Sequence, residues 1–442
     1  MGEAQTSQTV STKIERIATR AREAPTMALR TLAHHIDVDW LKEAYRRVRK
    51  DGATGVDGVT ADEYARDLEG NLRALHTRAK EGTYRAPPVR RVHIPKGDGR
   101  TRPIGIPTFE DKILQRAVAM VLEAIYEQDF MDCSYGFRPG RSAHEALKAL
   151  RDATMEMHGG WILEVDIQRF FDTLDHAHLR EALARRIGDG SLMRLIGKWL
   201  NAGAMEGLEL QRPDAGTPQG GVISPILANV YLHEVLDVWF EREVKPRLRD
   251  RAVLVRYADD FVIIFKREDD ARKVQAVLPK RFGKYGLTLH PEKTKLVPFN
   301  RPPKIDNDDD GEGPGSFDFL GFTHHWARSA NGNWVVMLRT AKASLSRAVK
   351  RIGEWCRRYR HLTVADQQAA LSRKLRGHYG YFGVVGNATA LWRFRHVVYR
   401  AWRSWLNRRS QRARVTWERM RVLIQHHPLP APEQARLRSL RT

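Results

Sequence analysis

The chain has 442 residues, of which 42% are hydrophobic and 9% aromatic, so wholesale disorder is excluded and two or three domains are expected. Its 75 Lys and Arg residues against 53 Asp and Glu give a net charge of +22, which attracts polyanions such as nucleic acid, although a solubility charge or a basic tail would give the same excess. No apolar run approaches the roughly 20 residues of a membrane span, and two cysteines are too few for a disulfide framework or a multi-cysteine zinc site, so we expect a reduced intracellular protein without a membrane segment.

The N-terminal part of the sequence predicts one binding element. The first dozen residues are rich in Ser, Thr and Gln, which is typical of a frayed tail. Further on, Ile94–Pro107 (IPKGDGRTRPIGIP) predicts a basic hairpin whose Lys96 and Arg102 are suited to triphosphate oxygens. An isolated basic turn would be weak evidence for a ligand.

An acidic residue ends the first strand-like run of the central part. The segment Trp161–Asp175 (WILEVDIQRFFDTLD) begins with an apolar strand and places Asp166 at its end. A carboxylate that leaves a buried strand has little structural reason to be there. After Phe171 the pattern is helical, so Asp172 and Asp175 are expected at the surface or as helix caps.

A turn rich in glycine and proline follows at Gly216–Pro225 (GTPQGGVISP), and it leads into the helical spacing of Ile226–Glu241. Because a turn of this kind has few obstructing side chains, its backbone can lie close to a nucleotide or a template base. An ordinary loop is the alternative.

The segment Val253–Phe265 (VLVRYADDFVIIF) predicts a β-hairpin with Asp259 and Asp260 at its tight end. Adjacent carboxylates repel each other unless a cation neutralises them, although Asp is also common in surface turns. Together with Asp166, three acids from two strands could hold two Mg²⁺ ions about 4 Å apart, the arrangement used for in-line attack on a phosphoryl group.

The C-terminal quarter carries most of the net charge. From Met337 onward, 24 Lys and Arg residues face four acids, a net charge of +20. Before it, Arg301–Ser316 predicts a solvated loop. Two amphipathic helices are predicted from apolar residues three and four apart, at Leu338, Ala341, Leu345, Ala348, Ile352 and Trp355 and at Leu391, Phe394, Val398, Ala401 and Trp405.

Between these helices, Arg376–Asn387 (RGHYGYFGVVGN) predicts a tight helix–helix turn. Arginines alternate with tryptophans in the second helix. Most of the tryptophans are expected in a core, and the guanidinium groups beside them make a surface that can track phosphates.

Taken in their order along the chain, the segments described above closely resemble those of the reverse transcriptase/maturase proteins encoded by bacterial group II introns. The likeness runs over about residues 56–421 and consists of VDGVT at 56–60, the basic hairpin at 94–107, YGFRPGRSAHEAL at 135–147, LEVDIQRFFD at 163–172, GTPQGGVISPILANVYL at 216–232, YADD at 257–260, GLTLHPEKTK at 286–295 and FDFLGF at 317–322. A lone YADD would be weak evidence, whereas the ordered series is specific.

The resemblance implies an α+β fold, namely a right-hand polymerase with fingers and a ferredoxin-like palm, followed by an all-helical thumb/maturase region. We therefore expect an N-terminal extension at 1–35, fingers at 36–158, a palm at 159–336 with an acidic loop insertion near 301–316, and a basic helical thumb/maturase domain at 337–442.

The resemblance also implies roles for individual residues. Asp166, Asp259 and Asp260 match the catalytic triad that binds two Mg²⁺ ions, with the Ile167 carbonyl as a further ligand. Lys293 matches the proton donor to pyrophosphate, with Lys295 as the alternative, and Phe171 matches the steric gate against a ribose 2′-OH. The expected substrate contacts are Lys96, Arg102, Phe171, Pro218, Gln219, Gly220 and Tyr257, and the expected RNA contacts are Arg393, Arg400, Arg403, Arg408, Arg409 and Arg412.

The function implied is an RNA-directed DNA polymerase that also binds its parent intron RNA and assists splicing and intron mobility. Its partners would be the intron RNA, an RNA template with a DNA primer, dNTPs and a DNA target, in the bacterial cytoplasm and at the nucleoid. There are two alternatives. One is a splicing factor with a vestigial polymerase site, and the other is a reverse transcriptase recruited to defence or CRISPR spacer acquisition. The longest members continue after the position of Arg421 into an endonuclease, so target cleavage is not expected here.

Overall fold

The computed structural model describes residues 2–95, 101–206, 209–211, 220–303, 315–410 and 414–434. Contacts divide the chain into two compact units, one made of Met1–Ala146, Val165–Ile263 and Asp269–Lys295, the other of Leu147–Glu164, Ile264–Glu268 and Leu296–Thr442. The predicted division into four consecutive parts stays a prediction. Across the described ranges, the helices are all too short or too polar to cross a membrane.

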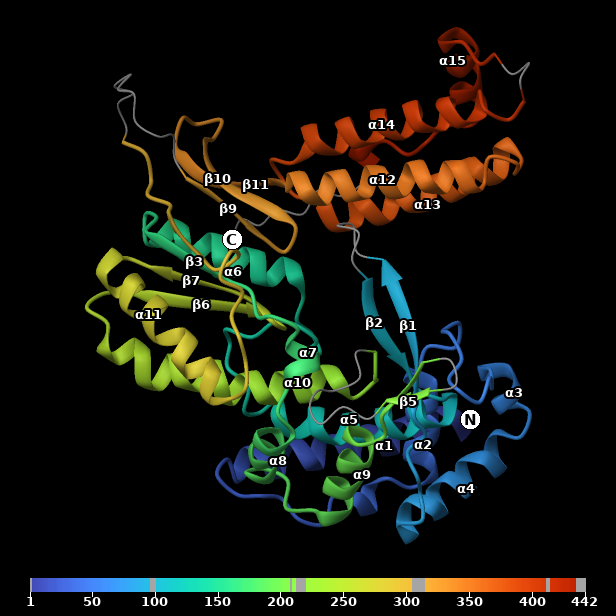
Figure 1. Cartoon of the computed structure of the whole chain (residues 1–442), viewed down its shortest axis with the longest axis vertical. Coiled ribbons are helices and arrows are strands. Elements are labelled where there is room, and N and C mark those ends of the chain that lie inside the picture. Colours follow the sequence, from blue (N-terminus) through green and yellow to red (C-terminus); the bar gives the residue numbers. More distant parts are fainter. Residues whose placement is uncertain are drawn as a thin grey trace. The chain divides into compact units, whose positions relative to one another are not determined.

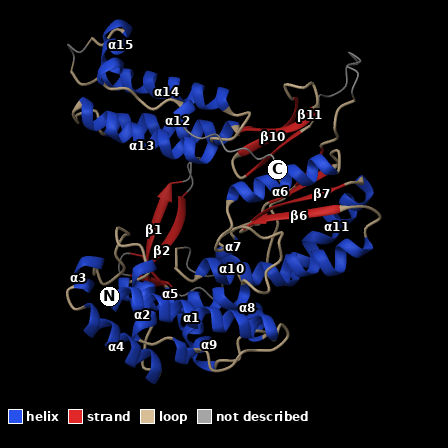
Figure 2. Cartoon of the chain, turned by 180° about the vertical axis from the view of Figure 1, so that it is seen from behind, coloured by secondary structure: helices blue, strands red, loops and turns tan. Residues whose placement is uncertain are grey.

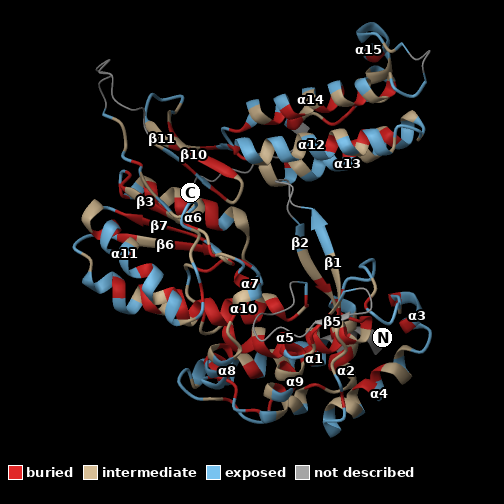
Figure 3. Ribbon diagram, viewed as in Figure 1, coloured by how far each residue is buried: buried red, intermediate tan, exposed pale blue. Residues whose placement is uncertain are grey.

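Helices make up most of the N-terminal part of the first unit (Figure 1). The first of them, α1, contradicts the predicted frayed tail, because Val10, Ile17 and Ala21 share one buried face that packs on α5 and α2. Helix α5 is itself buried along most of its length (Figure 3). The helical elements of this part are α1 (Gly2–Glu23), η1 (Ala33–His35), α2 (Val38–Arg47), α3 (Ala61–Ala65), α4 (Leu68–Glu81), α5 (Phe109–Tyr126), α8 (His176–Ala184) and α9 (Gly190–Leu200).

The predicted basic hairpin is confirmed. Strands β1 (Val89–Pro95) and β2 (Thr101–Ile106) pair antiparallel, with Arg90 opposite Ile106 and Pro95 opposite Thr101. The short strands β4 (Ala204–Glu206) and β5 (Glu209–Gln211) complete a sheet of order β2-β1-β4-β5.

The predicted acidic hairpin is also confirmed. Strands β6 (Ala252–Tyr257) and β7 (Asp260–Phe265) are joined by only two residues, and they belong to a sheet of order β6-β7-β3-β8 with β3 (Trp161–Val165) and β8 (Lys295–Pro298). The other helices of this central part are α6 (Ala143–Glu156), α7 (Phe170–Thr173) and α11 (Glu268–Lys284).

The helix predicted over 226–241 is present, but its winding changes along its length. It starts as α10 (Ser224–Leu232) and continues through two π-helical turns, η2 (His233–Asp237) and η3 (Phe240–Val244), to the 3-10 turn η4 (Lys245–Arg247). A π-turn inserts an extra residue into the helical repeat, so it changes the direction of the side chains that follow.

The second unit contains a three-stranded sheet of order β11-β10-β9, formed by β9 (Ser316–Phe319), β10 (Phe322–Arg328) and β11 (Trp334–Thr340). The predicted start of the first basic helix is therefore wrong: Leu338 lies in β11, Ala341 caps the helix, and the helix begins at Lys342. The predicted turn at Arg376–Asn387 is also too long, because the preceding helix continues to Phe382.

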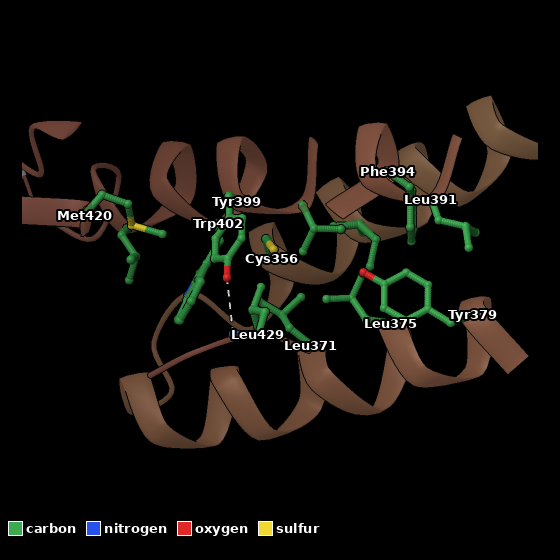
Figure 4. Packing of buried hydrophobic residues seen from close by; sticks show 13 residues of the cluster. Cys356, Leu371, Leu375, Tyr379, Leu391, Phe394, Tyr399, Trp402, Met420 and Leu429 are labelled. Atoms are coloured by element: carbon green, nitrogen blue, oxygen red, sulfur yellow. Dashed lines mark hydrogen bonds between the residues drawn. The ribbon is translucent and has the colours of Figure 1, made fainter. Parts of the chain in front are cut away.

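Four basic helices follow, and we call them the helical bundle: α12 (Lys342–Arg358), α13 (Val364–Phe382), α14 (Ala388–Leu406) and α15 (Trp417–His426), with a short 3-10 turn η5 (Pro432–Gln434) after them. Helices α12, α13 and α14 lie side by side (Figure 2). Their core includes Leu375, Leu391 and Trp402 (Figure 4). The Trp402 indole N–H donates a 2.7 Å hydrogen bond to the side-chain oxygen Oε1 of the buried Gln367, so the polar atom of the indole is satisfied.

Candidate functional site

The two acids of the β6–β7 hairpin sit on a constrained turn. Ala258 has a φ of +56°, which is unusual for a residue with a side chain, and Asp259 and Asp260 follow it directly. A Cβ added at Gly136 would lie 2.2 Å from the Ala258 nitrogen, so the backbone at Gly136 supports the turn by close contact. The turn that carries the acids is thus held by backbone from another part of the chain.

The third acid, Asp166, follows β3 on a segment that pairs with residues 288–290. The His290 amide donates to the Asp166 carbonyl at 2.8 Å, and the Gln168 amide donates to the Thr288 carbonyl at 2.8 Å. This pairing leaves the Ile167 carbonyl outside it. The neighbouring acids are placed as expected, because Asp172 is exposed and Asp175 caps α8.

The charge of Asp166 acts on both Asp259 and Asp260, and we call Asp166, Asp259 and Asp260 the carboxylate cluster. Burial raises the pKa of Asp259, and the charge of Asp166 adds to this effect. Desolvation of the carboxyl group and the charges of Asp259 and Asp166 raise the pKa of Asp260 to about 7, although the residue as a whole is exposed, while Lys293 and Arg102 act in the opposite direction. Without a cation, the cluster therefore resists full ionisation.

One positive side chain already contacts the cluster. The Lys293 Nζ lies 2.9 Å from Asp166 Oδ2, in an ion pair whose side chains are 60% and 32% exposed. Among the described residues, no three His, Cys, Asp or Glu side chains are gathered closely enough to hold an ion as they stand. The donor set nevertheless fits Mg²⁺, which prefers carboxylate and carbonyl oxygens and would relieve the repulsion within the cluster.

A fully buried arginine holds the turn from beneath. The Arg256 guanidinium donates to both carboxylate oxygens of Asp237, at 2.7 and 2.5 Å, and neither side chain is exposed. It also donates to the Ala258 carbonyl at 3.0 Å, to Asn229 at 3.0 Å and to the Ser134 hydroxyl at 2.7 Å. The π-turn η2 ends at Asp237, and so presents this carboxylate to β6.

Arg256 and its partners were not among the predicted site residues. The signal in the sequence was Arg256 within an otherwise apolar strand, a place where an arginine is rarely tolerated unless it is paired. The identity of its partners could not be read from the sequence, because Ser134 and Asp237 lie far from it along the chain.

Four predicted substrate residues lie within the described ranges, namely Arg102, Phe171, Gly220 and Tyr257. Arg102 lies on β2, and its charge acts on Asp259 and Asp260. Phe171 is 8% exposed and packs edge-on against Phe170, with ring centroids 5.3 Å apart. Gly220 has a φ of +111°, and a Cβ there would lie 2.6 Å from the Gly105 carbonyl of β2. Tyr257 ends β6, one residue before the turn.

Other predicted positions are outside the described residues. They are Lys96, Pro218, Gln219 and Arg412, together with the acidic segment at 306–312. Their expected roles stay predictions.

The predicted RNA-binding arginines of the bundle fall into two groups. Arg393, Arg400 and Arg408 are exposed on or just after α14. Arg403 is half-buried and donates to the Val415 carbonyl at 2.9 Å, and Arg409, although exposed, donates to the Arg360 carbonyl at 2.6 Å. The second pair therefore also contributes to the packing of the bundle.

Comparison with known families matches two stretches of the chain. Residues 94–324 match the family described as reverse transcriptase (RNA-dependent DNA polymerase), and residues 345–423 match the group II intron, maturase-specific domain. The first stretch contains the carboxylate cluster, and the second covers α12 to α15 except for their ends.

Individual relatives agree with these matches. Protein YkfC of Escherichia coli (strain K12) is 36% identical over 328 residues, which cover 66% of this chain and 85% of that protein. The group II intron-encoded protein LtrA of Lactococcus lactis subsp. cremoris is 40% identical over 213 residues, but these cover 46% of this chain and only 35% of LtrA. A solved telomerase structure from Candida albicans covers 78% of this chain and 60% of that one at 13% identity, with a TM-score of 0.43, which is too low to carry an argument.

Proposed function

Because this chain belongs to the reverse transcriptase (RNA-dependent DNA polymerase) family, we propose that it extends a DNA primer on an RNA template with two Mg²⁺ ions at the carboxylate cluster, and that its helical bundle binds group II intron RNA to assist splicing. The first half is carried by three acids within the matched residues 94–324: Asp259 and Asp260 on the constrained turn, and Asp166, whose charge acts on both of them and whose Oδ2 lies 2.9 Å from Lys293 Nζ.

In this proposal, Asp166, Asp259 and Asp260 hold the ions through carboxylate oxygens, and the Ile167 carbonyl supplies a backbone oxygen. When bound, the ions supply charge stabilisation at the phosphoryl group and lower the pKa of the attacking hydroxyl. The protein would hold the carboxylate oxygens in position before the ions bind, so that no rearrangement is needed. The Arg256 network would contribute by fixing the carbonyl of Ala258, next to Asp259.

The neighbouring residues would bind and orient the nucleotide. Arg102 has a positive charge that acts on Asp259 and Asp260, so it can also attract triphosphate oxygens, together with Lys96. The Lys293 Nζ lies 2.9 Å from Asp166 Oδ2 and would donate a proton to the departing pyrophosphate. Phe171 would exclude the 2′-OH, while Gln219 and the backbone of Pro218 and Gly220 would contact the nucleotide and template base.

The second half of the proposal rests on the match of residues 345–423 to a maturase-specific domain and on the positive charge of the bundle. Phosphates of the intron RNA would release counterions when they meet Arg393, Arg400 and Arg408. Binding of this kind is strongly salt-dependent, so its contribution can be measured separately from catalysis.

Substitution of the acids tests the catalytic half. In Asp166→Asn and Asp259→Asn, we expect extension of a DNA primer on an RNA template to fall by about a thousandfold or more, because several kcal/mol of charge stabilisation are lost. The affinity for RNA should stay within a few fold. Asp172→Asn is the matched control, since Asp172 is an exposed acid close to Asp166 in sequence, and it should keep wild-type extension.

Retained Mg²⁺-dependent synthesis in either cluster variant would exclude the catalytic assignment. If the wild-type protein binds intron RNA but extends no primer, the chain would instead be a splicing factor with a vestigial polymerase site.

A further inference from the structure

Phe137 combines two features that are unusual for a phenylalanine. Its φ of +57° lies in the left-handed region, which is costly for a bulky residue. Its side chain is also 53% exposed, although a phenylalanine gains most from burial. A bulky residue that is kept both strained and exposed suggests a function for its ring.

The backbone on both sides of Phe137 is firmly held. The side-chain amide of Asn229 donates to the Gly136 carbonyl at 2.7 Å, and Gly136 lies against the Ala258 backbone too closely for any side chain. On the other side, the buried Arg138 guanidinium donates to the Glu127 carboxylate and to the carbonyls of Met131 and Ser134 at 2.8 and 2.9 Å. The surrounding structure therefore imposes the conformation of Phe137 and the direction of its ring.

That direction brings the ring to Tyr257. The two ring centroids are 6.4 Å apart with an interplanar angle of 41°, and Tyr257 is separated from Asp259 by one residue. Asn229 accepts a hydrogen bond from Arg256 and donates one to Gly136, so the same network holds the acidic turn and the loop of Phe137.

We propose that Phe137 is a stacking surface for the nucleobase at the 3′ end of the primer. This inference rests on the proposed function, which places the primer 3′-hydroxyl at the carboxylate cluster. The base attached to that sugar would then face Tyr257, which precedes Asp259 by two residues, and the Phe137 ring beside it. Aromatic side chains stack on any base, so such a surface would hold the primer end without selecting a sequence.

The test measures the affinity of the full-length protein for a labelled DNA primer on an RNA template, at fixed salt and with divalent ions chelated. Phe137→Ala should weaken binding by about 5- to 100-fold, since stacking on an aromatic residue contributes this much per base. Phe137→Tyr should bind within about twofold of wild type because it keeps the ring. Val277→Ala, which truncates an exposed apolar side chain of α11, is the matched control and should also bind normally.

Two further measurements separate stacking from folding. Phe137→Gly should keep or raise the Tm, because glycine adopts a positive φ at little cost, and yet it should bind as weakly as Phe137→Ala. With a primer whose 3′ nucleotide is abasic, wild type should bind as weakly as Phe137→Ala does, and the substitution should have no further effect.

Equal binding of wild type and Phe137→Ala, or an unchanged difference on the abasic primer, would overturn the stacking role while primer extension by wild type keeps the proposed function intact. If the wild-type protein neither binds nor extends the primer, the proposed function itself fails, and this inference fails with it.

Discussion

The acidic hairpin and the helical bundle differ in how closely their charged groups lie together and in how far these groups are exposed. At the hairpin, a few charged groups lie close together and partly buried, and the Arg256–Asp237 pair beneath them is fully buried. In the bundle, the core is almost entirely apolar, and many positive charges face solvent. The arrangement at the hairpin fixes a small number of atoms in place, whereas the arginines and lysines of the bundle create a positive electrostatic potential over a wide surface.

This difference determines how each region should respond to substitution. Each group at the hairpin depends on its partners, so a single change should affect both folding and chemistry. In the bundle, stability comes from apolar packing and RNA affinity from separate arginines, so the two properties should change independently.

The largest effect is expected from Arg256→Met, which leaves the Asp237 carboxylate buried without its partner. We expect the free energy of unfolding to fall by about 3–5 kcal/mol, measured by chemical denaturation. The double variant with Asp237→Leu removes both charges and should regain part of this loss. Primer extension should be below that of wild type in both variants, because the Ala258 carbonyl has lost its donor. Full recovery of extension in the double variant would contradict the positioning role of Arg256.

A core substitution in the bundle gives the contrasting case. Leu391→Ala removes a fully buried side chain of α14 and should lower local stability by about 2–5 kcal/mol. Amide hydrogen exchange of α12–α14 measures this loss. Trp392→Ala, at the exposed neighbouring position, should lower it by much less, and equal losses would show that the apolar core does not provide the stability of the bundle.

Removal of exposed positive charge from the bundle should affect RNA affinity only. For a triple variant with Arg393→Gln, Arg400→Gln and Arg408→Gln, we expect the slope of log affinity against log salt to become shallower by about two units. Intron-RNA binding across a salt series measures it. The matched control replaces three exposed lysines of α11, Lys273, Lys280 and Lys284, with Gln. If the control flattens the slope as much as the triple variant, binding depends on total charge and not on the bundle.

A smaller, more local effect is expected at Phe171. Phe171→Ala should raise the rate of rNTP incorporation relative to dNTP by about tenfold, because a pocket that excludes one small group discriminates by about this amount. Competition between the two nucleotides in primer extension measures the ratio. Phe170→Ala should instead destabilise the fold, since Phe170 is 2% exposed, and a change of ratio at Phe170 alone would move the gate to that residue.

Features with a local pattern could be predicted from the sequence. The alternation in Val253–Phe265 identified the acidic hairpin, and the spacing from Leu391 to Trp405 identified α14. The boundary between strand β11 and helix α12 was predicted too early, because the strand pattern and the helix pattern overlap there. Val336 and Leu338 alternate as strand residues, but Leu338 also fits the helical spacing that follows.

Features that depend on distant residues could not be predicted. The polar composition of α1 hides Val10, Ile17 and Ala21, whose shared face is recognisable only beside the helix α5 that covers it. In the same way, nothing near Arg256 in the sequence indicates Asp237 as its partner, and nothing near Phe137 indicates that its ring reaches Tyr257.

The central claim is that catalysis belongs to the carboxylate cluster and RNA affinity mainly to the bundle. The most direct measurement tests Asp259→Asn and the triple arginine variant side by side for primer extension on a short saturating template and for intron-RNA affinity across a salt series. We predict that Asp259→Asn loses extension and keeps the wild-type salt slope, and that the triple variant keeps extension and has the shallower slope. Loss of both properties in both variants, or a wild-type slope in the triple variant, would contradict the claim.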